Sequence, residues 1–224
     1  MLNFYEDIHQ REHFYEHIEC LSDHLSKYFE EDEITIFHEM LSPDFHLDVY
    51  LIRPANRNYA ILLTSGASLL RMNVPDTIPN AAEYEFAEYM LLLPKDIQFA
   101  EVVNSKEGDK NDWIITMLKD IARFPHHYNT FFAIGHTVQA TEERTPYSPE
   151  TNFVGSALLP SVTFDEGFTK FMCGMDTINI YSVFPLYRNE LEFKMDKGYS
   201  DFIQLLIDGN VPEIFDENRP NLLG

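Results

Sequence analysis

Short apolar runs that end at turn residues constrain the fold of this chain more than any other feature. Residues 59–63 read YAILL and are followed by Thr64, Ser65 and Gly66, a combination that is typical of a turn. Residues 90–93 read MLLL and end at Pro94, which lacks the N–H that a helix or a central strand needs. Both runs are far too short to span a bilayer, which takes about 20 apolar residues. They predict buried strands in a soluble protein.

A third segment, residues 45–52, alternates along its length. Its odd positions, from Phe45 to Leu51, are all apolar, and its even positions run from His46 through Asp48 to Ile52. A period of two is typical of a strand with two different faces. We expect further strands over residues 34–40, 83–93, 130–139, 153–160 and 179–185.

Helical periodicity occurs near both ends of the chain and once in the middle. Residues 4–30 predict an amphipathic helix, and residues 113–124 predict a second helix that follows a cap at Asn111 or Asp112. Residues 187–197 and 200–208 predict two more, separated by Gly198. No repeat or low-complexity linker divides the chain. We therefore predict a single domain over residues 1–224 with an α+β fold, a mixed α/β sandwich whose mixed, largely antiparallel sheet is covered by N- and C-terminal helices.

The charge of the chain is strongly acidic and unevenly distributed. The formal net charge is -21, and residues 1–50 carry thirteen acidic residues against Arg11 and Lys27. Such a surface repels nucleic acid and anionic membranes, and it attracts a basic protein at a rate that falls as salt rises. Acidity also keeps a cytosolic protein soluble, so the charge alone does not establish a partner.

The two cysteines and the N-terminus bear on the cellular compartment. Cys20 and Cys173 form no CxxC or CxxH pair, and we expect them to be buried small apolar residues rather than a disulfide or a metal site. The N-terminal segment has no basic region followed by an apolar stretch, so no secretory signal is visible. We expect a cytoplasmic protein with reduced cysteines.

One motif suggests metal chemistry. Residues 13–17 read HFYEH, which matches the H-x-x-E-H pattern of inverted zincins. On a helix, His13 and His17 could bind one zinc ion with Glu16 as general base, and His9 extends the stripe by another turn. The stripe lies on the face away from the apolar residues of the predicted helix, so we expect these side chains to be exposed. A zinc-dependent hydrolase is therefore a minor alternative, and whether the stripe binds metal stays open.

No other catalytic pattern is complete. Residues 66–70 read GASLL and lack the final glycine of a nucleophile elbow, and the chain has no P-loop, GxGxxG or EF-hand sequence. The acidic residues between 208 and 217 are typical of a solvated surface. We predict no catalytic residue, no cofactor and no metal ligand, and we do not expect an enzyme.

An ordered series of short motifs resembles the suppressor-of-fused (SUFU) domain family. The series begins with LTSGAS at 63–68, EFAE at 85–88 and MLLLP at 90–94. It continues with GHTV at 135–138, FVG at 153–155 and LLP at 158–160, and it ends with YSVFPLY at 181–187, Glu190 and residues 216–220. The resemblance covers the chain from about residue 45 to the C-terminus, in order and with plausible spacing.

The resemblance implies a non-enzymatic protein-binding domain with a mixed α/β fold. Animal members hold a transcription factor inactive in the Hedgehog pathway, and stand-alone bacterial members, which this chain resembles more, are associated with immunity to toxins, often nucleases. Most motif residues of the family are typical of turns and packing, and in this chain they are Ser65, Gly66, Gly135, His136, Phe153, Pro185, Tyr187, Glu190, Asp216 and Arg219.

Charge and resemblance together predict an immunity protein, or antitoxin, that neutralises a basic nuclease-type toxin through an acidic surface. A cytosolic scaffold or regulator of a cellular protein is the alternative, because it would share the fold and differ only in its partner. The oligomeric state is left open. The residues expected to contact the toxin are Glu12, Glu16, Glu19, Asp23, Glu30, Glu31, Asp32, Glu33, Glu142 and Glu143.

Overall fold

A mixed eight-stranded sheet forms the centre of the computed structural model, which describes residues 8–42, 44–99 and 110–224, with side chains from Glu16 onward. The strand order is β1-β2-β3-β4-β8-β6-β5, and β7 pairs with β8 beside this path. Only β4 and β8 pair in parallel, so the predicted mixed, largely antiparallel sheet is confirmed. The strands are β1 (Ile34–Phe37), β2 (Asp48–Ile52), β3 (Tyr59–Ser65), β4 (Phe86–Pro94), β5 (Thr137–Gln139), β6 (Gly155–Leu159), β7 (Lys170–Cys173) and β8 (Asp176–Leu186).

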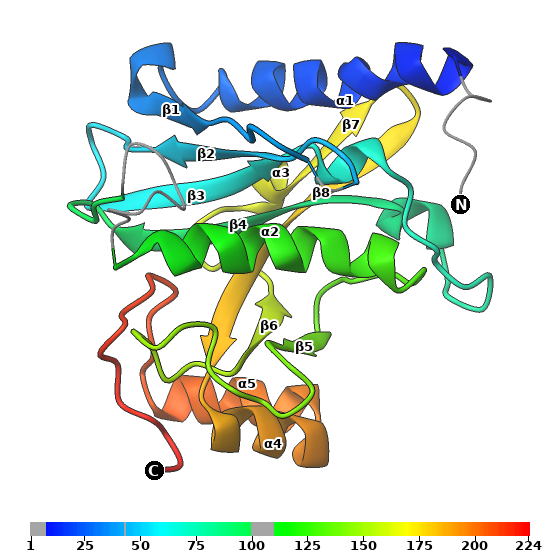
Figure 1. The fold of residues 1–224 in the computed structure, drawn as a ribbon. Helices are drawn as coiled ribbons and strands as arrows, with labels where there is room; N and C mark the ends of the chain where they lie inside the picture. Colours follow the sequence, from blue (N-terminus) through cyan, green and yellow to red (C-terminus); the bar gives the residue numbers. More distant parts are fainter. Residues whose placement is uncertain (1–7, 43, 100–109) are drawn as a thin grey trace.

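Helices cover both faces and one end of this sheet. Figure 1 shows α1 on one side of the central strands and α2 on the other, with α4 and α5 together beyond β6. The predicted α+β class is therefore confirmed. The helices are α1 (Ile8–Leu25), α2 (Asp112–His127), α3 (Glu166–Thr169), α4 (Arg188–Lys197) and α5 (Tyr199–Asp208).

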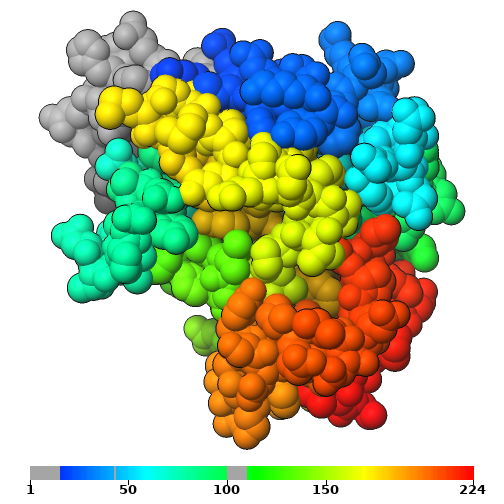
Figure 2. Space-filling model, turned by 180° about the vertical axis from the view of Figure 1, so that it is seen from behind, coloured from blue at the N-terminus to red at the C-terminus, as the bar shows by residue number. Residues whose placement is uncertain are grey.

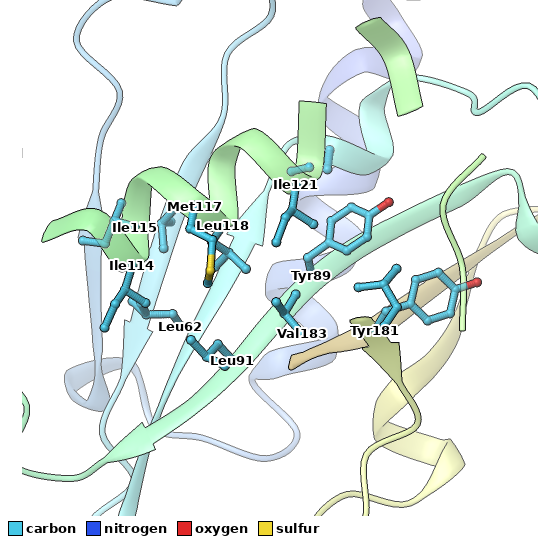
Figure 3. Close-up of a cluster of buried hydrophobic side chains, with 14 of the residues drawn as sticks. Leu62, Tyr89, Leu91, Ile114, Ile115, Met117, Leu118, Ile121, Tyr181 and Val183 are labelled. Atoms are coloured by element: carbon cyan, nitrogen blue, oxygen red, sulfur yellow. The ribbon is translucent and has the colours of Figure 1, made fainter. Parts of the chain in front are cut away.

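Strand β3 shows why the apolar runs do not alternate. Ile61 and Leu63 pack in the cluster that contains Leu21 of α1, whereas Leu62 packs in the cluster that contains Leu118 of α2. All of these side chains are buried. Figure 3 shows the α2 side of this arrangement, with the helix lying over Leu62 and Leu91. A central strand covered on both faces needs apolar residues at every position, which is what the sequence supplies.

Several predicted elements differ from the structure in length, and two of them have a clear physical reason. Helix α1 ends at Leu25, before the end of the helix predicted over 4–30, and a short 3₁₀ turn follows over Glu31–Glu33. Four consecutive acidic residues are unfavourable at the negative end of a helix dipole. Of the strand predicted over 130–139, only Thr137–Gln139 pairs, because Gly135 adopts a φ of 88° and turns the chain just before it.

The expectation of two unpaired cysteines was wrong. Cys20 of α1 and Cys173 of β7 form a disulfide across 153 residues of sequence. Figure 2 shows the segment that contains β7 beside α1 on the surface. Neither β7 nor the short helix α3 before it was predicted, and without these elements the sequence did not indicate that the cysteines meet. Among the described residues, no helix is both long and apolar enough to cross a membrane.

Candidate functional site

The LTSGAS turn is held by a buried carboxylate. Glu88 of β4 is completely buried and accepts hydrogen bonds from the Thr64 hydroxyl (2.6 Å) and from the backbone N–H (2.9 Å) and hydroxyl (2.7 Å) of Ser68. It also accepts the N–H groups of Gly66 (3.0 Å) and Ala67 (3.3 Å). Burial raises the pKa of Glu88, and these hydrogen bonds offset part of that effect.

Gly66 makes this turn possible. Its φ of +122° is strained for other residues, and a Cβ atom there would lie 2.6 Å from the backbone oxygen of His46. Ser65, the residue before Gly66, is the last residue of β3 and is also buried. Sequence reasoning missed Glu88, although an acidic residue in the middle of an apolar strand was a visible signal.

A second buried carboxylate holds the C-terminal segment. Glu190 of α4 is completely buried and accepts two hydrogen bonds from the Arg219 guanidinium, at 2.7 and 2.5 Å. Arg219 also donates to the backbone oxygen of Pro185 (2.9 Å), and its guanidinium lies 4.8 to 5.1 Å from the ring centres of Phe153 and Tyr187. A planar cation enclosed by aromatic rings and a carboxylate fixes these segments to one another.

The remaining family-motif residues lie close to these networks or to β5. The backbone oxygen of Asp216 accepts the N–H of Arg219 (3.1 Å). Near β5, the backbone oxygen of Gly135 accepts a hydrogen bond from Lys194 (2.6 Å), and His136 Nδ1 accepts the N–H of Ala133 (3.2 Å). Burial and the nearby charge of Lys194 lower the pKa of His136.

A groove of about 1040 Å³ opens between the second half of α2, strand β5 and helix α4. Tyr128, at the end of α2, is 70% exposed, and Met195 of α4 is 60% exposed on the other side. Phe131 and Tyr147 contribute further aromatic surface. A concave surface with exposed aromatic and methionine side chains is typical of sites that bind proteins or peptides.

Strand β5 borders this groove and is the last strand of the sheet. The N–H of Ala140 donates to Val154, and the backbone oxygen of His136 accepts the N–H of Leu158. Since backbone groups alternate in direction along an antiparallel strand, the backbone groups of Thr137 and Gln139 point away from β6. No strand of the described chain pairs with this outer edge, which leaves it open to another polypeptide.

The acidic residues predicted to bind a partner form two separate groups. In the first group, Glu16, Glu19 and Asp23 are exposed on α1, and Glu30, Glu31 and Asp32 are exposed beyond it. Glu33 accepts the N–H of Ala55 (2.6 Å), and the side chain of Glu12 lies outside the described part of the chain. Glu142 and Glu143 are exposed in the loop after β5, and only Glu142 borders the groove.

The exposure predicted for the H-x-x-E-H motif was wrong at His17. Its side chain is buried, with Nδ1 2.6 Å from the backbone oxygen of Ser68 and Nε2 3.2 Å from Asp176. The buried positions of α1 include 17, 21, 24 and 25, so its inner face is rotated from the one assigned by sequence. Glu16 is exposed, and the side chains of His9 and His13 lie outside the described part of the chain.

Comparison with known proteins now identifies the family. The family model described as suppressor of fused protein (SUFU) matches residues 43–220, which is most of the chain. This chain belongs to the SUFU family. The resemblance noted in the sequence is thereby confirmed.

Solved SUFU structures share the fold. A SUFU homologue from Neisseria gonorrhoeae superimposes with a TM-score of 0.64 at 14% identity, over 92% of this chain and 96% of the other. Sufu in the Sufu-Fu complex gives a TM-score of 0.63 at 12% identity, over 92% of each chain. Drosophila Suppressor of Fused gives 0.54 at 10% identity, and there 92% of this SUFU chain spans 50% of the larger protein. No curated protein matches the sequence.

Proposed function

We propose that this SUFU-family chain is a non-catalytic protein-binding domain whose partner adds an extended segment to β5 and places side chains in the adjoining groove. The observation that carries the proposal is an open strand edge beside a concave aromatic surface. Backbone hydrogen bonds to the edge would supply affinity, and the groove would select among side chains. That Sufu was solved in a Sufu-Fu complex supports protein binding as the mode of action.

The charge of the chain favours a basic partner. A net charge of -21 would speed the approach of a cationic protein, and Glu142 at the rim of the groove would contribute locally. A nuclease toxin, which must bind a polyanion, has a basic surface of the required kind. We therefore extend the proposal to an immunity protein that neutralises such a toxin, with the acidic face of α1 steering the encounter.

Two alternative functions remain, a scaffold or regulator and a zinc-dependent hydrolase. The first differs from the proposal in its partner, and the second requires a bound metal ion. A scaffold or regulator would use the same groove for an abundant, non-toxic cellular protein. A hydrolase that uses His13, Glu16 and His17 is disfavoured, because His17 would have to give up a hydrogen-bond partner to bind zinc. The cytoplasmic location stays a prediction, and the disulfide between Cys20 and Cys173 is more typical of an oxidising compartment.

The test is affinity capture from the native cell at low and high salt, with identification of the bound proteins by mass spectrometry. A single basic polypeptide that is released by high salt and is toxic when expressed alone would support the immunity function. A non-toxic partner that still needs the groove would support the scaffold function, and capture independent of the groove would refute the proposed site.

Two variants locate the binding surface. Gln139→Pro removes one outward N–H of β5, and Tyr128→Ala removes the most exposed aromatic side chain of the groove. Each should weaken binding of the captured partner by at least about tenfold, since central aromatic contacts are worth about 1–2 kcal/mol or more. Tyr28→Ala, at an exposed tyrosine that follows α1, is the matched control and should bind like the wild type.

The contribution of the acidic face of α1 is tested separately, through the association rate. Neutralising Glu12, Glu16, Glu19 and Asp23 together should lower the association rate and flatten its dependence on salt, with a smaller effect on dissociation. The groove variants should instead speed dissociation. An unchanged association rate would remove this face from the proposal and leave the groove in place.

A further inference from the structure

Two histidines and one aspartate meet where β1 and β2 pair. Phe37, the last residue of β1, pairs with Val49, so His38 continues from β1 next to Asp48 at the start of β2. His46 lies two residues before Asp48, in the segment that leads into β2. The register of a single strand pair thus brings together three side chains that are separated by up to ten residues in sequence.

The distances between these side chains are short. His38 Nδ1 lies 2.9 Å from Asp48 Oδ2, and His46 Nε2 lies 2.9 Å from Asp48 Oδ1. One ligand atom from each residue falls within 4.8 Å of the other two. In a tetrahedral zinc site with bonds of about 2.0–2.1 Å, ligand atoms are roughly 3.3 Å apart. Small side-chain rotations would therefore bring these three ligand atoms to the separations that a bound ion requires.

The contacts around His46 hold its ring through one nitrogen and leave the other facing Asp48. The Ser42 hydroxyl gives its one hydrogen to Glu39 Oε2 (2.8 Å), so it can only accept from His46 Nδ1 (3.3 Å). His46 Nε2 faces Asp48 Oδ1 at 2.9 Å, a position from which both atoms could bind one cation.

Further contacts orient the carboxylate. Asp48 Oδ1 accepts the backbone N–H of Glu39 at 2.9 Å, which fixes the aspartate side chain. Its side chain is 15% exposed, whereas those of His38 and His46 are 67% and 48% exposed. The oriented carboxylate therefore lies beneath two accessible imidazoles, and water could fill the remaining coordination positions.

We propose that His38, His46 and Asp48 bind one divalent transition-metal ion. Two imidazoles and one carboxylate suit zinc, which accepts three protein ligands and a water molecule in a tetrahedral site, and cobalt(II) can report the same geometry. The bound ion would link the end of β1 to the start of β2. It would also stabilise the loop between them, which contacts α2 through the Glu39–Arg123 ion pair.

The test is calorimetric titration of the chelator-treated protein with zinc chloride. The wild type should bind one equivalent, and His38→Gln combined with His46→Gln should weaken binding by more than about 100-fold, because loss of outer-shell partners alone costs 10- to 100-fold. His127→Gln is the matched control, since His127 is a half-exposed histidine that also pairs with a carboxylate, Asp44. Without metal, the wild type and both variants should unfold at the same temperature, because the altered histidine rings are substantially exposed.

A second control separates this site from the histidines of α1. His9→Gln combined with His13→Gln should leave zinc affinity and the visible absorption of the cobalt(II) complex unchanged. If this variant abolishes the binding, the site lies on α1 and the proposal is wrong. It is equally wrong if the wild type does not bind zinc, or if the His38 and His46 double variant binds it as tightly.

Discussion

Glu88 and Glu190 are both completely buried carboxylates, but the protein satisfies them in different ways. Within the described part of the chain, Glu88 accepts hydrogen bonds only from hydroxyl and backbone N–H groups, none of which carries a charge. Glu190 pairs with the Arg219 guanidinium and also accepts the N–H groups of Tyr187 and Leu222. A buried carboxylate is thus satisfied either by uncharged donors or by a counter-ion.

The difference follows from what each carboxylate holds in place. The donors to Glu88 lie 20 to 24 residues away in sequence, at the end of β3 and in the turn that follows it. Glu190 joins α4 to the C-terminal segment, 29 residues further on, where no strand pairing is available. Segments that are not joined by the backbone hydrogen bonds of paired strands need a stronger, directional contact. Most SUFU motif residues of this chain lie in or beside these two networks. Of the motif residues, only His136 borders the proposed partner groove.

The largest effect is expected from removing the counter-ion. Arg219→Met should lower the free energy of unfolding by about 3–5 kcal/mol, because it leaves an unpaired charge in the interior. Chemical denaturation measures this loss. Adding Glu190→Gln should restore part of it.

Arg71→Met is the matched control for that variant. Arg71 also pairs with a glutamate and lies over an aromatic ring, but its side chain is 64% exposed. Its loss should cost less than about 1 kcal/mol. Equal effects at the two arginines would show that burial does not set the strength of the Arg219 pair.

Removing the charge of Glu88 should have an intermediate effect. Glu88→Gln places an NH₂ group against donors of the turn, so we expect a loss of about 1–3 kcal/mol in the free energy of unfolding. Glu85→Gln, at a partly exposed position three residues earlier, should change it little. If Glu88→Gln is neutral, the turn donors do not require a carboxylate.

The smallest expected effect is the change with pH in the stability that Glu88→Gln removes. The pKa of Glu88 is raised in the folded state, so its contribution to stability is fully present below its unfolded value of 4.5 and declines as pH rises through the folded pKa. The stability difference between wild type and variant should therefore narrow from pH 5 to pH 8. A widening gap would mean that the hydrogen bonds outweigh burial and lower the pKa instead.

Local patterns predicted the middle of the sheet well. The alternation over 45–52 correctly assigned Phe45 and Leu51 to one face and Tyr50 and Ile52 to the other, where they pack on the α2 side and the α1 side of the sheet. The runs at 59–63 and 90–93 became neighbouring strands, and the helix predicted over 113–124 lies within α2. These elements could be predicted because every residue reports its own burial through its polarity.

The candidate sites were less predictable. The groove combines α2, β5 and α4, whose residues carry no shared motif, and β5 is too short for its alternation to be visible. The cluster of His38, His46 and Asp48 depends on the register between β1 and β2. The face of α1 that contains His17 was misassigned, because a buried histidine with two partners looks polar in sequence.

The sequence by itself determined the SUFU family, the α+β class and the apolar strands, because these depend on the order and polarity of neighbouring residues. The tertiary structure alone decided that Cys20 meets Cys173, that Arg219 neutralises Glu190 and that β5 lies at an open edge. Each of these features joins residues or elements that are far apart in the chain. The physical reason is that local periodicity records which side of an element is buried, but not which distant segment covers it.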